Sequence, residues 1–112
     1  MNRPDTVAVL TTVGDMAAAR TLARSLVERR LAACVQLSAI ESFYRWDGAV
    51  QHAPEVRLVC KTSAAAAAAL HEAIVELHPY SVPAVYAMPL ADVHPPYAQW
   101  VGAETAIRPE PG

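Results

Sequence analysis

The sequence predicts an α+β sandwich in which strands and helices follow in the order β-α-β-β-α-β, with a short helix at the end. Three observations support this prediction. Stretches rich in β-forming residues alternate with two stretches of helical periodicity. An Asp47-Gly48 pair divides one long segment into two arms of alternating hydrophobicity. Two prolines, Pro95 and Pro96, are suited to open a final helix.

A short strand and an amphipathic helix open the chain. Residues 6–12, TVAVLTT, are rich in β-branched residues, Gly14 closes this run, and Asp15 can cap the helix that follows. The sequence therefore predicts a strand over 6–12 and a helix over 16–31. The apolar residues of that helix recur at helical spacing, at Ala19, Leu22, Ala23, Leu26 and Val27.

The segment from residue 32 to residue 62 predicts a long β-hairpin. Asp47-Gly48 favours a type I′ turn, in which both central residues need a positive φ. If Trp46 and Ala49 flank the turn, the numbers of paired residues sum to 95. A bulge near residues 38–41 or at Pro54 would shift this register by one and exchange the two faces. In the register without a bulge, one face carries the pairs Val35–Cys60, Leu37–Leu58 and Ala39–Val56. The other face carries Cys34, Gln36, Arg57 and Lys61.

Each arm of this hairpin extends over about 14 residues, against about 5–6 for a typical strand. At about 3.3 Å per residue an arm reaches about 45 Å, far beyond the ~13 Å radius of gyration of such a domain. The distal half must therefore project, although it carries Phe43, Tyr44 and Trp46. Because monomers rarely leave such a patch open, we expect another copy of the chain to cover it.

The second helix is predicted from Ser63 onward. Ser63 is a natural N-cap, six alanines follow it, and Leu70, Ile74 and Leu77 continue at helical spacing. Pro79 ends the helix, because the residue before a proline is disfavoured in the αR conformation.

The last elements are a strand and a short helix. From Val82 the run VPAVYAMPL alternates like a strand, and Pro83 and Pro89 favour an edge position. The helix that Pro95-Pro96 open carries Tyr97, Trp100 and Val101 on one side.

This order is the ferredoxin-like arrangement, a four-stranded antiparallel sheet with both main helices on one face, a long projecting β-hairpin and a short C-terminal helix. The helices should cover the face with Val35, Leu37, Leu58 and Cys60. The opposite face should contact a neighbouring subunit together with the hairpin. We expect residues 1–112 to form one domain, with 1–5 and 106–112 loose.

Composition and charge exclude several classes of protein. Hydrophobic residues make up 54% of the chain and charged residues 18%, as in a folded domain. The net charge is −2 and the basic residues are scattered, which argues against binding nucleic acid or an anionic membrane. The N-terminal MNRPDT lacks a signal-peptide core and no apolar run reaches the ~20 residues of a membrane span, so we expect a cytoplasmic protein.

The two cysteines, Cys34 and Cys60, are too few and too far apart for a zinc site. We expect reduced thiols packed within strands, with a disulfide or metal role as the alternative.

Several segments together resemble the CutA (CutA1) family, the divalent-cation tolerance proteins. They are ERRLAACVQL, FYRWDG, PEVRLVCKT, LHPYSVPAVYAMP and YAQW, in the order and spacing of that family from about Val7 to Trp100. The resemblance implies a ferredoxin-like fold and a tight homotrimer, with interlocking hairpins and sheets that face inward. It also implies intersubunit clefts, an architecture similar to that of the PII signalling proteins, and a link to tolerance of copper and other divalent metals.

The resemblance further implies a metal site, made in the bacterial member by a cysteine near the end of the first strand and two adjacent histidines before the proline of the HPY motif. These positions are Thr11, Leu77 and His78 here. Because Cu(I) favours sulfur and Cu(II) favours imidazole, only His78 remains a candidate copper ligand. Two alternatives stay open for His78: an imidazole bonded locally at a subunit cleft, and a plain exposed helix end. The family also commonly has Glu where this chain has Ala84.

The residue patterns do not indicate an enzyme, because the glycines stand alone without a phosphate loop and no serine lies in an elbow-like context. A candidate ligand cleft consists of Tyr44, Trp46, Glu55, Lys61 and Tyr80. Lys61, the only lysine, can hold an anion there or form a structural ion pair within the trimer.

Three functions follow as hypotheses. The first is a homotrimer that binds a divalent metal such as a copper ion. The second is a PII-like sensor or adaptor that binds a small anionic metabolite. The third is a structural or interaction trimer without a ligand. None of them requires a cofactor.

Overall fold

The computed structural model describes residues 5–106, and the elements in this range follow the expected order. The strands are β1 (Thr6–Val13), β2 (Cys34–Trp46), β3 (Ala49–Ser63) and β4 (Val85–Pro89). The helices are α1 (Met16–Glu28), α2 (Ala67–Leu77) and α3 (Pro95–Glu104). The chain ends were expected to be loose over residues 1–5 and 106–112. Of these, residues 1–4 and 107–112 lie outside the described residues.

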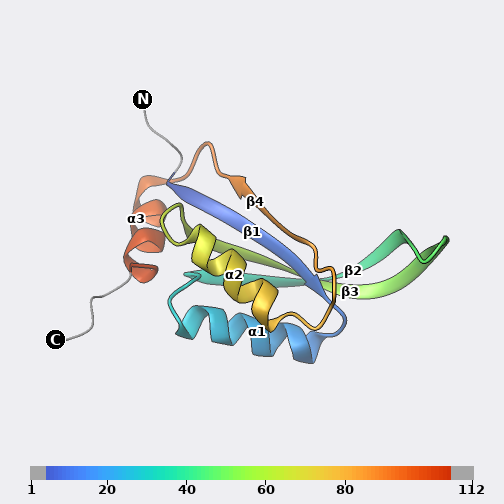
Figure 1. Cartoon of the computed structure of the whole chain (residues 1–112). Helices are drawn as coiled ribbons and strands as arrows, with labels where there is room; N and C mark the ends of the chain where they lie inside the picture. Colours follow the sequence, from blue (N-terminus) through green and yellow to red (C-terminus); the bar gives the residue numbers. More distant parts are fainter. Residues whose placement is uncertain (1–4, 107–112) are drawn as a thin grey trace.

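The four strands form one antiparallel sheet in the order β2-β3-β1-β4. Helices α1 and α2 lie together on one face of it, and α3 lies at the end of the sheet away from the hairpin tip (Figure 1). The ferredoxin-like α+β fold is therefore confirmed. The opposite sheet face, on which α1 and α2 do not lie, is called the open face below.

The predicted hairpin register is confirmed over its whole length. Pairing runs without a bulge from Cys34↔Lys61 to Trp46↔Ala49. The turn has φ values of 53° at Asp47 and 77° at Gly48, as a type I′ turn requires.

The distal half of the hairpin projects from the domain (Figure 1). The two arms have 13 and 15 residues, but β1 pairs only with β3 residues 56–63. The projecting part therefore has no third strand beside it. It lengthens the molecule to 49 Å and raises the radius of gyration to 15.2 Å, above the ~13 Å of a compact chain of this length.

The hydrophobic core lies between the sheet and the two main helices. Residues of β1 and β3 face the helices, and residues of α1 and α2 pack against them. Val35 and Leu37 of β2 pack at the edge of this core. Burying each Val, Leu or Ile side chain of this core stabilises the folded state by about 1.5–3 kcal/mol. The core consists of Val7, Val9 and Val13; Val56, Leu58 and Cys60; Ala19, Leu22 and Leu26; and Leu70, Ala73 and Ile74, with Ala32 beside them.

Helix α1 begins as predicted and ends earlier. The Asp15 carboxylate accepts a hydrogen bond from the Ala18 N–H at 2.7 Å and so caps the first turn. The helix ends at Glu28 instead of residue 31, because the chain reverses through Arg30, which has a φ of 59°. Val27, expected on the apolar face, is 42% exposed.

The expected start of α2 is wrong. Ser63 is the last residue of β3 and pairs with Thr6, so strand pairing overrides the helix propensity of the alanines that follow. The Ser63 hydroxyl accepts from the Ala66 N–H at 3.3 Å in the connecting turn, and the helix begins at Ala67. Leu77, expected on the buried face, lies in the last turn and is 46% exposed.

Strand β4 is shorter than expected and starts at Val85 instead of Val82. It pairs with β1 only from Val7 to Thr11, and Pro83 has no N–H to offer a ladder. The edge position that the prolines indicated is confirmed.

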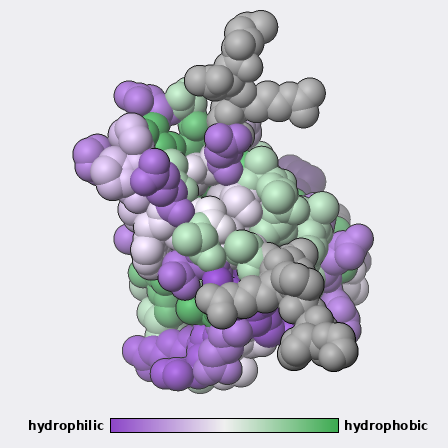
Figure 2. All heavy atoms as spheres, turned by 90° about the vertical axis from the view of Figure 1, so that its left-hand side faces the viewer, coloured by the Kyte–Doolittle hydropathy of each residue, from purple (hydrophilic) through white to green (hydrophobic). Residues whose placement is uncertain are grey.

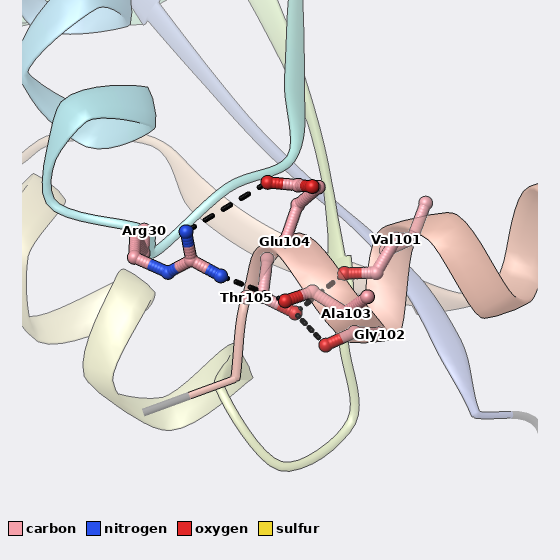
Figure 3. Close-up of polar contacts among 6 residues, drawn as sticks. All are labelled: Arg30, Val101, Gly102, Ala103, Glu104 and Thr105. Carbon is pink, nitrogen blue, oxygen red and sulfur yellow. Dashed lines mark hydrogen bonds and ion pairs between the residues drawn. The ribbon is translucent and has the colours of Figure 1, made fainter. Parts of the chain in front are cut away.

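Helix α3 is held by the reversal at the end of α1 (Figure 3). Arg30 donates from Nη2 to the Ala103 carbonyl at 2.8 Å, and its Nη1 lies 3.8 Å from Glu104 Oε2. This positive charge stands where the helix dipole is negative. Val101 is buried, whereas Trp100 of the same helix is 45% exposed.

The surface at the end of the molecule where α3 lies has two parts (Figure 2). It is hydrophilic along the lower edge, where α1 lies, and hydrophobic in its middle.

Candidate functional site

An open cleft of about 790 Å³ lies at the point where the hairpin leaves the sheet. Strand β2 contributes residues 41–44 and Trp46 to its lining, and β3 contributes Glu55. Thr12 comes from the end of β1, while residues 80–82, Ala84 and Tyr86 come from the segment that joins α2 to β4 and from β4 itself. The inner strands thus form the floor of the cleft, and the two edges of the sheet supply its walls.

Strand alternation turns the main side chains of the cleft toward the open face. Tyr44 and Trp46 lie two residues apart on β2 and so share a face. Glu55 pairs with Ile40, which belongs to the same alternating set. Tyr86 pairs with Leu10 of β1. The odd-numbered valines of β1 belong to the core beneath the helices, so the even-numbered Leu10 and its partner Tyr86 are directed to the open face.

Tyr80 and Glu55 form the polar centre of the cleft. The Tyr80 hydroxyl donates to Glu55 Oε2 at 3.0 Å. Burial and then the hydrogen bond and charge of Glu55 raise the pKa of Tyr80 from 10.0 to about 12. A Cβ atom at Gly14 would lie 3.4 Å from this hydroxyl, at contact distance, so the Tyr80 side chain lies beside the end of β1.

Both ring nitrogens of His78 are used inside the fold. The Tyr80 N–H donates to His78 Nδ1 at 3.1 Å, so Nδ1 is the acceptor and the proton sits on Nε2. That Nε2–H donates to the Thr12 carbonyl at 2.8 Å. The side chain is 8% exposed, and its ring lies 4.8 Å from the Tyr80 ring. His78 therefore ties the end of α2 to β1 and positions Tyr80.

The residues at the implied metal positions do not fit a copper site. Thr11 is fully buried, and its Oγ1 has no hydrogen-bond partner among residues 5–106. Leu77 offers no donor atom, and the nitrogens of His78 are engaged. Within the described part of the chain, no three His, Cys, Asp or Glu residues are grouped so that they could hold a metal ion.

Four of the five residues named for the ligand cleft line it: Tyr44, Trp46, Glu55 and Tyr80. Of these, Tyr80 contacts Glu55, whereas Trp46 pairs with Ala49 and so lies six residues from Glu55, about 20 Å along the hairpin. Lys61 lies elsewhere, six residues from Glu55 along β3, or about 20 Å in an extended strand. Its Nζ donates to Gln36 Oε1 at 2.6 Å, across the hairpin. An anion site that combines Lys61 with the cleft is thus not formed within one chain.

Sequence reasoning missed Thr12, Glu41 and Tyr86 as lining residues of the cleft. The alternation of Ala84, Tyr86 and Met88 was a usable signal for Tyr86, since it places these side chains on one face. No comparable signal existed for Thr12 or Glu41, which reach the cleft only through tertiary contact.

Both cysteines are free thiols in strands, Cys34 half-buried at the start of β2 and Cys60 buried in β3, so the expected packing holds for Cys60. Cys60 is fully buried, and burial is the main cause that raises its pKa to about 12. A thiol in this state is a poor nucleophile and a poor metal ligand.

Comparison with known proteins adds a consistent result. The family model described as "CutA1 divalent ion tolerance protein" matches residues 7–104. The divalent-cation tolerance protein CutA of Thermus thermophilus is 43% identical over 98 residues, which cover 87% of this chain and 95% of that protein.

Solved structures agree with the sequence match. The structure of CutA from Synechococcus elongatus has a TM-score of 0.90 at 31% identity, with 95% of each chain covered. The periplasmic divalent cation tolerance protein CutA from Archaeoglobus fulgidus has a TM-score of 0.87 at 26% identity, with 90% of this chain and 99% of that chain covered. None of the helices formed by residues 5–106 has the length and apolar character needed to cross a membrane.

Proposed function

The chain belongs to the CutA1 divalent ion tolerance family, and from this premise we propose that it acts as a homotrimer that binds a small molecule in the cleft beside Tyr80 and Glu55. In this proposal the protein contributes to divalent-cation tolerance, as the family description says, through a trimer that responds to a bound small molecule. The observation that carries it is the aromatic surface of the projecting hairpin, which no other segment among residues 5–106 covers.

That surface is large and apolar. On the projecting hairpin Phe43 is 69% exposed, Trp46 53% and Val50 65%. On the open face Tyr86 and Met88 of β4 are also exposed. Soluble monomers rarely carry a patch of this kind, whereas subunit interfaces are rich in aromatic residues and Met. The resemblance to CutA proteins favours three copies with interlocked hairpins.

The cleft lies beside this surface and shares Phe43, Trp46 and Tyr86 with it. A neighbour that covers the hairpin would therefore also border the cleft. Concave sites between subunits are common places for small ligands, and a site of this kind is what the likeness to PII signalling proteins implies. The third hypothesis, a trimer without a ligand, would leave the open cleft of about 790 Å³ without a role.

A direct role in holding copper is not part of the proposal. His78 uses both ring nitrogens inside the fold, and Thr11 and Leu77 supply neither sulfur nor imidazole. The tolerance function would instead depend on the state of the small-molecule cleft. No catalytic reaction is assigned to it.

We also propose that the protein works in the cytoplasm. Cys34 and Cys60 are unpaired thiols, which fits a reducing compartment. Cell fractionation with a tagged full-length chain tests this, and recovery outside the cytoplasmic fraction would contradict it.

The test of the proposed function uses a matched pair of variants. Trp46→Glu places a charge on the hairpin surface, and Val75→Glu places one on the outer face of α2, where Val75 is 46% exposed. We expect Trp46→Glu to lower the native mass and Val75→Glu to leave it unchanged. A panel of small metabolites should raise the Tm of the wild type and not that of Trp46→Glu. Equal native mass in both variants, or no shift with any compound, would count against the proposal.

A further inference from the structure

The open face of the sheet carries few charged side chains. By strand alternation it presents the even-numbered residues of β1, β2 and β4 and the odd-numbered residues of β3. Among the described strand residues on this face, the carboxylate, guanidinium and ammonium groups are those of Glu55, Arg57 and Lys61, all on β3. Lys61 donates to Gln36. The remaining charges of the face are therefore those of Glu55 and Arg57.

Arg57 stands in the middle of the open face without a partner. Its cross-strand neighbours are Ser38 of β2 and Thr12 of β1. Its guanidinium forms no hydrogen bond and no ion pair with any of residues 5–106, and the side chain is exposed. A single chain thus leaves this positive charge to water.

Glu55 carries the matching negative charge on the same strand. It lies two residues from Arg57, about 7 Å along β3, yet the two side chains form no ion pair within the chain. Strand β1 pairs with β3 only from Val56 onward, so Glu55 lies just beyond the end of β1, where its Oε2 accepts from Tyr80. The carboxylate is therefore satisfied on one side and has no basic partner among residues 5–106.

A neighbour that covers the open face makes an unpaired Arg57 costly. Tyr86 and Met88 lie on this face and are 50% and 45% exposed, as part of the surface that the proposed trimer covers. A guanidinium that is removed from water without a counter-charge strongly destabilises an interface. The neighbouring copy must therefore offer an acceptor to Arg57.

We propose that in the trimer the partner's Arg57 pairs with Glu55 at the cleft. This inference rests on the proposed function and names the group that a neighbouring copy adds to its site. Each chain gives one guanidinium and receives one, so three copies can satisfy all of these charges in a closed ring. The other carboxylates of the hairpin fit less well, because Glu41 lies 3.0 Å from His52 Nε2 on the opposite face and Asp47 lies in the exposed turn.

This pairing changes the charge of the cleft. Within one chain the lining contains two carboxylates, Glu41 and Glu55, and no Lys, Arg or His of the described residues belongs to it. The partner's Arg57 adds a positive group with several N–H donors, which can bond a carboxylate in bidentate fashion. The cleft of the proposed function is therefore complete only in the assembled protein.

Charge reversal tests the pair through the affinity between copies, measured by sedimentation over a dilution series. Arg57→Glu places two carboxylates opposite each other, and we expect it to weaken trimer formation at least about tenfold. Arg20→Glu makes the same charge change on the exposed side of α1 and should leave the affinity unchanged. Circular dichroism checks the fold of each variant, and Arg57→Gln replaces a reversal that does not fold, with the same expected direction. Equal affinity of the Arg57 and Arg20 variants would overturn the inference.

Co-expression of two variants distinguishes a bond between copies from one within a chain. Arg57→Glu and Glu55→Arg chains each carry like charges in place of the pair, whereas the two kinds of chain can meet with opposite charges. We expect native mass spectrometry to show more mixed trimers than random assembly gives. A pair formed within one chain cannot be restored in this way, so random proportions would overturn the inference.

Two further samples separate the remaining outcomes. Asp47→Asn removes the carboxylate at the hairpin tip and should leave the affinity between copies unchanged, whereas Glu55→Gln should weaken it. The reverse result would place the partner's Arg57 at the tip and overturn the inference. A wild-type trimer that is insensitive to Arg57 contradicts the ion pair and leaves the proposed function standing, but a wild-type monomer contradicts the proposed function itself.

Discussion

The Tyr80 hydroxyl donates to the Glu55 carboxylate at 3.0 Å and so joins β3 to the segment that follows α2. The backbone N–H of the same Tyr80 donates to His78 Nδ1, and His78 in turn donates to the Thr12 carbonyl. These three bonds hold one wall of the cleft against the end of β1. The cleft therefore has a polar centre that a single chain builds by itself.

The Tyr80–Glu55 bond predicts a pH dependence of stability. Because the folded pKa of Tyr80 is raised to about 12 from 10.0, the protonated phenol favours the folded state. Its contribution is complete below about pH 10 and is lost as the pH rises toward 12. Tyr80→Phe should lower the free energy of unfolding by about 0.5–1 kcal/mol at pH 9, since the pair is partly exposed.

Urea unfolding at pH 9 and pH 11 checks this. The difference in unfolding free energy between wild type and Tyr80→Phe should shrink at the higher pH. Tyr86→Phe is the matched control, because the Tyr86 hydroxyl makes no hydrogen bond within the described residues. A difference that stays constant between the two pH values would show that Glu55 does not hold the phenol protonated.

His78→Ala separates a structural role from a metal role. Removing the imidazole leaves the Thr12 carbonyl and the Tyr80 N–H without their partners. We expect the free energy of unfolding to fall by about 2 kcal/mol, while copper affinity stays at the wild-type level. Chemical unfolding and a copper titration of the same samples measure both quantities. A stable variant that has lost tight copper binding would contradict the structural role.

Thr11→Val tests the buried hydroxyl on β1. Thr11 is fully buried and its Oγ1 has no hydrogen-bond partner among residues 5–106. The hydroxyl therefore loses its hydration on folding without gaining a hydrogen bond, which destabilises the folded state. Replacing it by a methyl group keeps the shape, and we expect the free energy of unfolding to rise by about 1 kcal/mol. A loss of stability in thermal and urea unfolding would mean that Oγ1 makes a favourable contact after all.

Arg30 combines a strained backbone with a contact to α3. Arg30→Ala loses the bond to the Ala103 carbonyl and keeps the φ of 59°, so we expect a loss of about 1–2 kcal/mol. Arg30→Gly loses the same bond but adopts that φ without strain, and should be about 0.5–1 kcal/mol more stable than Arg30→Ala. Urea unfolding of the pair measures this, and an alanine variant as stable as the glycine variant would argue against strain at this position.

Local chemistry made the hairpin predictable from sequence. Asp47-Gly48 specifies a turn type, the turn fixes the register, and the register assigns every side chain to a face, so one dipeptide determines the pairing from Cys34 to Lys61. The cap at Asp15 and the helix end before Pro79 are local in the same sense.

The errors arose where tertiary pairing overrides local preference. Ser63 and the first alanines after it favour a helix by themselves, yet pairing with Thr6 keeps Ser63 in β3. The site follows the same rule. Alternation put Tyr44 and Trp46 on one face, but the contact between Tyr80 and Glu55 spans 25 residues and needs the folded chain. Lys61 shares the polar face with Glu55 and still lies outside the cleft, because a sheet face is long.

Sedimentation equilibrium of the wild-type chain at micromolar concentration tests the account most directly. We expect other copies of the chain to cover the exposed aromatic side chains of the projecting hairpin, where Phe43 is 69% and Trp46 53% exposed. We predict a single species with three times the chain mass of 12.0 kDa. A well-folded species at the mass of one chain would contradict the trimer and, with it, the assignment of function to an intersubunit cleft.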